Sequence, residues 1–193
     1  MPARSKLCGL VLAPGASASR DQAGLVELDQ AIGAIGVEVE RIDFPYRLAG
    51  RRAPDRPPVL IEAITEASSA LASRLGVAQS RIALGGRSMG GRIASMAVAE
   101  GLSAGALVLV SYPLHPPGRP DRLRVEHFPQ ITVPCLFVSG SRDAFGTPEE
   151  LEAAVAAIPA AVSLVVLYRG DHGLARRASE VATIAADWIR AQR

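Results

Sequence analysis

The first candidate for chemistry in this sequence is a serine with glycines at fixed spacing on both sides, in the run Gly86-Arg87-Ser88-Met89-Gly90. The same Gly-x-Ser-x-Gly pattern also arises by chance where a glycine-rich turn opens a helix. Its flanks favour the chemical interpretation, because residues 81–84 are typical of a short buried strand and apolar residues recur at helical spacing over 93–97. A serine on such a sharp turn exposes its Oγ, and only glycine fits two residues before and after it. We therefore predict that Ser88 is a nucleophile on a nucleophile elbow.

A serine hydroxyl is a weak nucleophile unless a base accepts its proton, and the base must be oriented by a third group. The sequence holds three histidines. His172 follows the last predicted strand and precedes the last predicted helix, so its imidazole can lie at the same sheet edge as Ser88. His115 and His127 lie in a proline-rich segment, where a surface or loop-packing role is expected. His172 is therefore the predicted base.

Two aspartates compete for the role of the third group. Asp143 lies just past the end of the fifth predicted strand, again at the carboxyl edge of the sheet. Asp171 is adjacent to His172, and neighbouring residues on a chain rarely point at one another, so a loop-stabilising role suits it better. The resulting chain order is Ser88, Asp143, His172, which is the order of the triad in α/β hydrolases.

The oxyanion formed when a serine attacks an acyl group needs two hydrogen-bond donors already in place. The N–H of Met89, at the positive end of the helix that begins at the elbow, is one candidate. The N–H of Ala16, in the loop after the first predicted strand, is the other, whereas Pro14 has no N–H to donate. The side chain of Arg87 either reaches toward solvent or contacts substrate, and both alternatives stay open.

Apolar runs alternate with amphipathic stretches, which is typical of a mostly parallel sheet covered by helices on both faces. We predict an α/β fold, a three-layer α/β/α sandwich with about six strands. The predicted strands are Lys6–Ala13, Val37–Ile42, Arg81–Gly85, Ala106–Val110, Cys135–Ser139 and Ser163–Leu167.

The helices between them have recognisable ends. The sequence Ser19-Arg20-Asp21-Gln22 predicts a capping box that opens the first helix. A second helix is expected over about 58–75, with Gly76 as its C-cap. Thr147-Pro148-Glu149-Glu150 predicts another capped helix start, and that helix should stop at Pro159.

The segment 41–58 breaks this alternation, because five arginines stand among prolines and no regular structure is expected there. It is either a solvated connection or a rim of the active site that favours anionic substrates. The second interpretation follows from its position after a strand, where ligand clefts form in open α/β sheets.

Composition limits the class of protein. The chain has 193 residues, of which 49% are hydrophobic and 21% charged, which suits one well-buried domain over 1–193. A formal net charge of +2 is too small for a nucleic-acid-binding signature, so no nucleic-acid partner is expected. No metal site and no cofactor are predicted.

The N-terminal run could be mistaken for a secretory signal, because Arg4 and Lys6 precede an apolar stretch. We interpret that stretch as a central strand instead, and no run is long enough to span a bilayer. The two cysteines, Cys8 and Cys135, fall in predicted buried strands, where each would be a small core residue in a reducing compartment. A cytoplasmic protein is therefore the expectation.

At these residues the chain resembles the α/β-hydrolase superfamily, and more narrowly the compact group related to dienelactone hydrolase. Within that group it is similar to small hydrolases related to testis-expressed and histone-acetyltransferase-complex subunit proteins. The matching stretches are Ala13-Pro14-Gly15-Ala16-Ser17, Gly85-Gly86-Arg87-Ser88-Met89-Gly90-Gly91-Arg92, Val110-Ser111-Tyr112-Pro113-Leu114-His115, Val138-Ser139-Gly140-Ser141-Arg142-Asp143 and Gly170-Asp171-His172. Arg87, Tyr112 and His115, within these stretches, are the candidate substrate-binding residues.

The resemblance implies a parallel sheet that lacks the first two strands of the larger fold, with Ser88, Asp143 and His172 as triad. Dienelactone hydrolases proper use a cysteine at the position of Ser88, which argues against dienelactone as substrate. The segment 112–134 is too short for a helical cap domain, so an open site is expected. The leading hypothesis is a serine hydrolase that cleaves a carboxylic ester or thioester. The alternative is a non-catalytic interaction module that retains the hydrolase scaffold.

Overall fold

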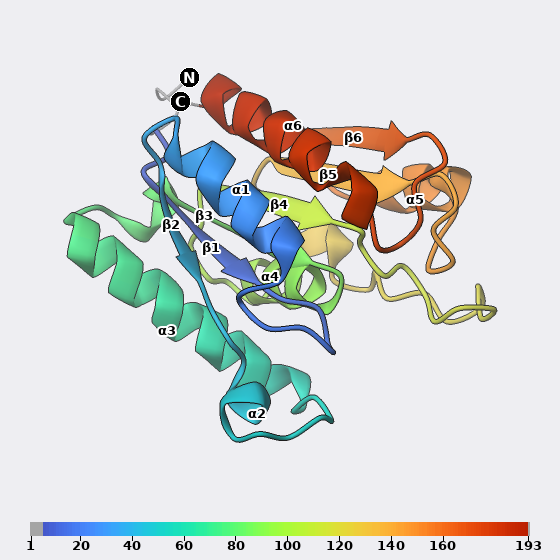
Figure 1. The fold of residues 1–193 in the computed structure, drawn as a ribbon, viewed down its shortest axis with the longest axis horizontal. Helices are drawn as coiled ribbons and strands as arrows, with labels where there is room; N and C mark the ends of the chain where they lie inside the picture. The colour runs from blue at the N-terminus through green and yellow to red at the C-terminus, as the bar shows by residue number, and fades with distance from the viewer. Residues whose placement is uncertain (1–5, 193) are drawn as a thin grey trace.

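The computed structural model describes residues 6–192, which form a six-stranded sheet with helices on both faces (Figure 1). All five neighbouring strand pairs are parallel, in the order β2-β1-β3-β4-β5-β6. The strands are β1 Gly9–Ala13, β2 Glu38–Arg41, β3 Ile82–Arg87, β4 Ala106–Val110, β5 Cys135–Gly140 and β6 Val162–Leu167. All six predicted strands are therefore confirmed, with ends that differ by at most three residues.

Helices connect the strands. They are α1 Ala23–Gly33, α2 Pro45–Leu48, α3 Pro57–Leu75, α4 Met89–Ala99, α5 Pro148–Val155 and α6 Ala178–Ala191, with short 3-10 helices η1 Gln79–Arg81, η2 Phe128–Gln130 and η3 Ala175–Arg177. Helices α1 and α6 lie side by side over one face of the sheet (Figure 1), and helices α3, α4 and α5 cover the other. The central strands β1, β3, β4 and β5 are buried on both faces. Their sequences are therefore continuous apolar runs and do not alternate between apolar and polar residues. The predicted α/β/α sandwich is confirmed.

Two predicted helix ends are confirmed by their hydrogen bonds. The Thr147 hydroxyl accepts from the N–H of Glu150 at 3.2 Å, and the Glu150 carboxylate accepts from the N–H of Thr147 at 2.7 Å, which completes a capping box. Gly76 ends α3 in the left-handed conformation, with φ of 64°. Helix α5 ends at Val155, four residues before Pro159, so the prediction that it runs on to this proline was wrong.

The capping box predicted at Ser19 is wrong, because α1 begins at Ala23 with Gln22 as its N-cap and no side-chain cap. The N–H of Gln22 donates to the Ser19 carbonyl in a turn, and the N–H of Arg20 donates to the Asp43 side chain at 2.8 Å. A contact with a segment twenty-three residues away therefore shapes the turn before this helix. The Gln22 side chain is left free to face inward, which matters for the site below.

The segment 41–58 contains regular structure that its sequence did not predict. The short helix α2 lies within it, and α3 begins at Pro57, where proline fits the first helical position. Arg41 forms ion pairs with Asp21 and Asp29, and Arg51 pairs with Asp55. These arginines are therefore neutralised by local carboxylates.

The carboxyl ends of the parallel strands share one edge of the sheet, and the loops at that edge carry the predicted chemistry. Between β4 and β5 the only regular structure is η2, so no helical cap covers this edge. The apolar run after Lys6 is strand β1 in the sheet interior, and Arg4 lies outside the described residues. Among residues 6–192 no helix is long and apolar enough to cross a bilayer.

Candidate active site

Ser88 occupies the turn between β3 and α4 with φ of 51° and ψ of −119°, a backbone conformation that residues other than glycine rarely adopt. The turn passes very close to the end of β1. A Cβ added at Gly86 or at Gly90 would lie 2.1 Å from the carbonyl oxygen of Ala13. The two glycines of the motif are thus required by contact with a neighbouring strand, and together they hold Ser88 in its strained, partly exposed position.

Three side chains from three loops meet at this turn. The Nε2 of His172 lies 2.9 Å from the Oγ of Ser88, and its Nδ1 lies 2.8 and 2.9 Å from the two carboxylate oxygens of Asp143. A carboxylate only accepts, so Nδ1 carries the proton and Nε2 is free to accept from the serine hydroxyl. The structure therefore brings together the nucleophile, base and acid proposed from the sequence.

The imidazole of His172 is held from two further directions. The ring of Phe145 stacks on it, with centroids 4.0 Å apart and planes inclined by 29°. The Arg87 guanidinium donates to the backbone carbonyl of His172 at 2.6 Å, and burial lowers the pKa of this arginine. Asp171 turns away from the imidazole and accepts from the N–H of Leu174 at 2.9 Å, which is the loop role expected for it.

Asp143 is fixed by its own loop. The Asp143 side chain is 1% exposed, and it also accepts from the N–H of Phe145 at 2.8 Å. Phe145 therefore contacts His172 with its ring and Asp143 with its backbone N–H. This residue was missed in the sequence, because a phenylalanine in a loop carries no pattern that marks it as part of a site.

The loop after β1 lies against the elbow from the other side. A Cβ added at Gly15 would lie 3.7 Å from the Cβ of Ser88. The hydroxyl of Tyr46, a buried residue of α2, donates to the carbonyl of Ala16 at 2.6 Å. The N–H of Ala16 takes part in no hydrogen bond with any residue from 6 to 192, and Met89, as the first residue of α4, has no acceptor within its helix. Among residues 6–192, two N–H donors are thus without an acceptor beside Ser88.

Comparison with known proteins agrees with this geometry. A family model described as an alpha/beta hydrolase domain matches residues 7–193. The chain belongs to the α/β-hydrolase family. The fold of this α/β hydrolase is dienelactone-hydrolase-like, as its sequence suggested.

Solved structures share the fold at low sequence identity. A dienelactone hydrolase from Anabaena variabilis matches with a TM-score of 0.77 and 20% identity, over 97% of this chain and 87% of that one. Est1E from Butyrivibrio proteoclasticus matches with a TM-score of 0.77 and 17% identity, over 97% of this chain and 88% of that one. An alpha-beta serine hydrolase homologue from Coxiella burnetii matches with a TM-score of 0.77 and 19% identity, over 95% of this chain and 85% of that one. At these identities the likeness concerns the fold alone.

An open cleft of about 440 Å³ lies over the Ser88 hydroxyl of this α/β hydrolase. It is lined by Gly15, Ala16, Ser17, Ala18, Gln22, Arg87, Ser88, Met89, Arg92, Pro113, Arg124, Phe145 and His172. Three arginines and no Asp or Glu belong to this lining. Arg51 and Arg52 are not part of it, and within the basic segment 41–58 it is Tyr46 that hydrogen-bonds to the loop after β1.

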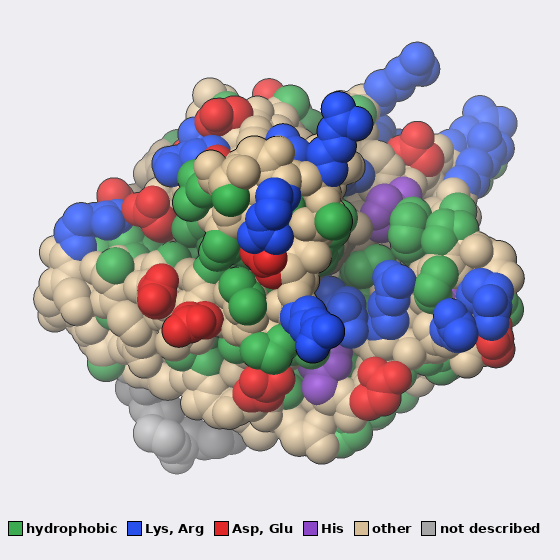
Figure 2. Space-filling view, turned by 90° about the horizontal axis from the view of Figure 1, so that it is seen from below, with side chains coloured by type: hydrophobic (Ala, Val, Ile, Leu, Met, Phe, Trp, Pro, Cys, Tyr) green, Lys and Arg blue, Asp and Glu red, His purple; other side chains and the backbone are tan. Residues whose placement is uncertain are grey.

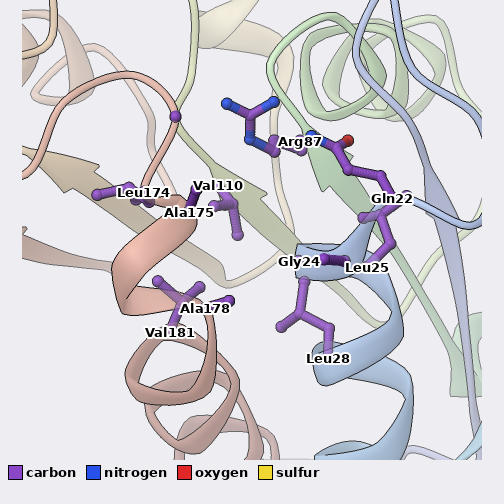
Figure 3. A pocket seen from close by; sticks show the side chains of 12 residues that line it. Gln22, Gly24, Leu25, Leu28, Arg87, Val110, Leu174, Ala175, Ala178 and Val181 are labelled. Carbon is purple, nitrogen blue, oxygen red and sulfur yellow. The ribbon is translucent and has the colours of Figure 1, made fainter.

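A second, smaller cavity of about 100 Å³ adjoins the cleft at Arg87 and Gln22 (Figure 3). It lies between the first turns of α1 and α6, and its walls are mostly aliphatic. In Figure 3, Leu28 and Val181 lie at the end away from Arg87. The Arg87 Nε and the Gln22 Oε1 at its border are buried and make no hydrogen bond within the described part of the chain. The capping box predicted at Ser19 would have used the Gln22 side chain. That side chain lines the cavity instead.

Of the three residues predicted from the sequence to bind substrate, only Arg87 lines the cleft. The Tyr112 side chain is buried between Phe128 and Phe137, and its hydroxyl donates to the Arg124 carbonyl at 2.7 Å. His115 is also buried, with its ring bonded to the Pro116 carbonyl and the Glu150 carboxylate. Neither side chain lines the cleft, so we assign neither of them to substrate contact.

The remaining histidine and the cysteines lie outside the site. His127 is bonded to the Ser95 hydroxyl at 2.8 Å, and burial, with Arg92 nearby, lowers its pKa to about 4. Cys135 is buried in β5, where burial raises the pKa of its thiol to about 12. Cys8 precedes β1 and is partly exposed, so its predicted burial in a strand was wrong.

Proposed function

We propose that this α/β hydrolase is a serine hydrolase that cleaves a carboxylic ester or thioester through an acyl-enzyme on Ser88. One observation carries the proposal, namely the continuous line of hydrogen bonds from the Ser88 Oγ through both ring nitrogens of His172 to the buried carboxylate of Asp143. A scaffold without catalytic activity has no physical need for this arrangement on a strained turn.

The first half of the reaction forms the acyl-enzyme. The Ser88 Oγ attacks the carbonyl carbon while its proton passes to the Nε2 of His172, and Asp143 stabilises the imidazolium. The oxyanion accepts from the N–H groups of Met89 and Ala16. The tetrahedral intermediate then collapses, the bond to the alcohol or thiol breaks, and the leaving group departs with the proton from His172.

The second half repeats these steps with water. His172 accepts a proton from the attacking water, the second tetrahedral intermediate collapses, and the proton returns to the Oγ of Ser88 as the acid is released. Because no cap covers the cleft, small esters, or an acyl group displayed on a larger molecule, fit it better than long lipids do.

The test is covalent labelling by a fluorophosphonate probe, followed by intact mass, together with steady-state hydrolysis of 4-nitrophenyl acetate. We expect wild type to gain one adduct, and Ser88→Ala and His172→Ala to gain none. We expect Asp143→Asn to lose about 10³-fold or more in kcat, because the imidazole loses its orienting carboxylate.

A matched control is available one residue before the base. Asp171→Asn removes a charge beside His172 but keeps an oxygen that can accept from the N–H of Leu174, so its kcat should stay within about threefold of wild type. No labelling and no turnover by folded wild type would refute the proposal and favour the interaction module.

A further inference from the structure

The cleft above Ser88 holds an unbalanced positive charge. Arg87, Arg92 and Arg124 line it, and no carboxylate belongs to its lining. Figure 2 shows Lys and Arg side chains grouped around a hollow on this side of the molecule, with histidine side chains between them. Among the arginines of the cleft, Arg87 is already engaged, since it donates to the carbonyl of His172.

Arg92 and Arg124 have no such partner. In the described part of the chain neither guanidinium forms an ion pair or a hydrogen bond, and the Nε of Arg92 is fully buried without an acceptor. Both side chains are partly buried. Arg41, by contrast, is also partly buried and forms ion pairs with Asp21 and Asp29.

The two cations are also near one another. Burial lowers the pKa of Arg124, and the charge of Arg92 lowers it further. Like charges brought together out of water are unfavourable unless an opposite charge offsets them. No carboxylate of the described residues belongs to the lining of this cleft. A bound anion would supply the opposite charge that the two arginines lack.

Both arginines are held where a substrate on Ser88 can reach them. Arg92 is one helical turn after the nucleophile, and its N–H donates to the Ser88 carbonyl at 3.1 Å. The backbone of Arg124 is fixed at both ends, because its N–H donates to the Leu114 carbonyl at 2.8 Å and its carbonyl accepts from the Tyr112 hydroxyl at 2.7 Å. Tyr112 thus helps to fix Arg124 without lining the cleft itself.

We propose that the substrate is an ester or thioester that carries an anionic group, a carboxylate or a phosphate, and that Arg92 and Arg124 bind this group while the acyl carbonyl lies on Ser88. Guanidinium groups suit both anions, because their N–H donors match a pair of oxygens. The inference rests on the proposed serine hydrolase and names its substrate class. The reaction itself is unchanged, since the anion binds but forms no covalent bond.

The test compares acetate esters that differ only in the group opposite the ester on a phenyl ring. 4-Acetoxybenzoate carries a carboxylate, 4-acetoxyphenyl phosphate carries a phosphate, and 4-acetoxybenzamide is the neutral partner. A second pair, mono-4-nitrophenyl glutarate and 4-nitrophenyl pentanoate, places the carboxylate on the acyl side instead. We expect wild type to favour at least one anionic ester over its neutral partner by about tenfold or more in kcat/KM, mainly through KM.

Variants assign the preference to the two arginines. Arg92→Gln and Arg124→Gln should each lower kcat/KM for the preferred anionic ester by about tenfold, and change that for neutral esters by less than about threefold. Arg92→Lys, which keeps a charge, should retain part of the preference. Arg122→Gln, an exposed arginine on the same loop outside the cleft lining, removes an equal charge and should leave the preference intact. Added salt should weaken the preference in wild type.

The outcomes separate the two proposals. Hydrolysis of neutral esters without any preference for the anionic ones would overturn this inference and leave the serine hydrolase standing. The inference would also be wrong if the arginine variants lost activity on neutral and anionic esters equally. Failure of folded wild type to hydrolyse any of these esters would overturn both.

Discussion

The ring of Phe145 lies stacked on the imidazole of His172, with the centroids 4.0 Å apart. The same residue donates its N–H to the Asp143 carboxylate at 2.8 Å. One residue from the loop before α5 therefore contacts both His172 and Asp143, the proposed base and acid. Its ring covers one face of the imidazole.

Phe145→Ala should slow turnover without removing it. Loss of a stacking contact worth about 0.5–1.5 kcal/mol frees the imidazole to leave its productive orientation, so we expect kcat on a neutral ester to fall by roughly two- to tenfold. The backbone bond to Asp143 survives in this variant. Phe145→Leu, which keeps an apolar side chain over the ring, should recover part of the rate. Steady-state kinetics and the rate of fluorophosphonate labelling measure the activity of both variants. Equal rates in wild type, Phe145→Ala and Phe145→Leu would contradict a positioning role for the ring.

Gly90→Ala should destabilise the fold rather than only the chemistry. The new Cβ would lie 2.1 Å from the Ala13 carbonyl oxygen, so strand β1 or helix α4 must move, and we expect a loss of more than about 3 kcal/mol in the free energy of unfolding. Urea unfolding followed by circular dichroism measures this loss.

The matched control is Gly33→Ala at the end of α1, where an added Cβ meets no atom within 4 Å. Alanine is the better helix former, so this variant should be unchanged or gain up to about 1 kcal/mol. A Gly90→Ala protein as stable as wild type would show that the elbow can relax, against the close packing described above.

Tyr46→Phe should affect both stability and rate, because it removes the hydrogen bond from the Tyr46 hydroxyl to the Ala16 carbonyl. We expect a loss of about 1 kcal/mol in unfolding free energy and a fall of roughly three- to tenfold in kcat, since the Ala16 N–H would no longer be held toward the oxyanion.

Tyr112→Phe offers the comparison, because Tyr112 is another buried tyrosine whose hydroxyl donates to a backbone carbonyl, at 2.7 Å. It should lose similar stability yet hydrolyse a neutral ester at the wild-type rate. If both variants slowed neutral-ester turnover alike, the effect of Tyr46 would be general destabilisation and not control of the oxyanion loop.

His127 should make stability depend on pH in the mildly acidic range. Its pKa is about 4 in the folded protein and near 6.5 when the chain unfolds, so the unfolded state binds the proton more readily between these values. The free energy of unfolding should therefore fall as pH drops from about 6.5 toward 4. The ring is only partly buried, so we expect a loss of up to about 2 kcal/mol by pH 4.5.

His127→Gln keeps a group able to bond with the Ser95 hydroxyl and removes the titration. Urea unfolding at several pH values should show a smaller decline in this variant than in wild type. Parallel declines in the two proteins would assign the acid sensitivity to other groups.

The sequence by itself determined the strands, the tight turn at Ser88 and the three side chains that meet there, which we propose as a triad. These features depend on local signals: continuous apolar runs for buried parallel strands, glycines beside Ser88, and the order of Ser88, Asp143 and His172 after successive strands. Parallel strands bring their carboxyl ends to one edge, so residues that follow different strands meet there without any further information.

The tertiary structure alone decided what surrounds Ser88, Asp143 and His172. Helix α1 begins at Ala23 and not at Ser19, where the N–H of Arg20 instead donates a hydrogen bond to the Asp43 carboxylate. Whether an arginine faces a carboxylate or the cleft depended on the packing around it. Arg51 has Asp55 four residues away, whereas Arg92 and Arg124 have no carboxylate partner among residues 6–192. Periodicity and turn chemistry act over a few residues, but contacts such as Phe145 on His172 join segments far apart in the chain, and only the folded arrangement selects them.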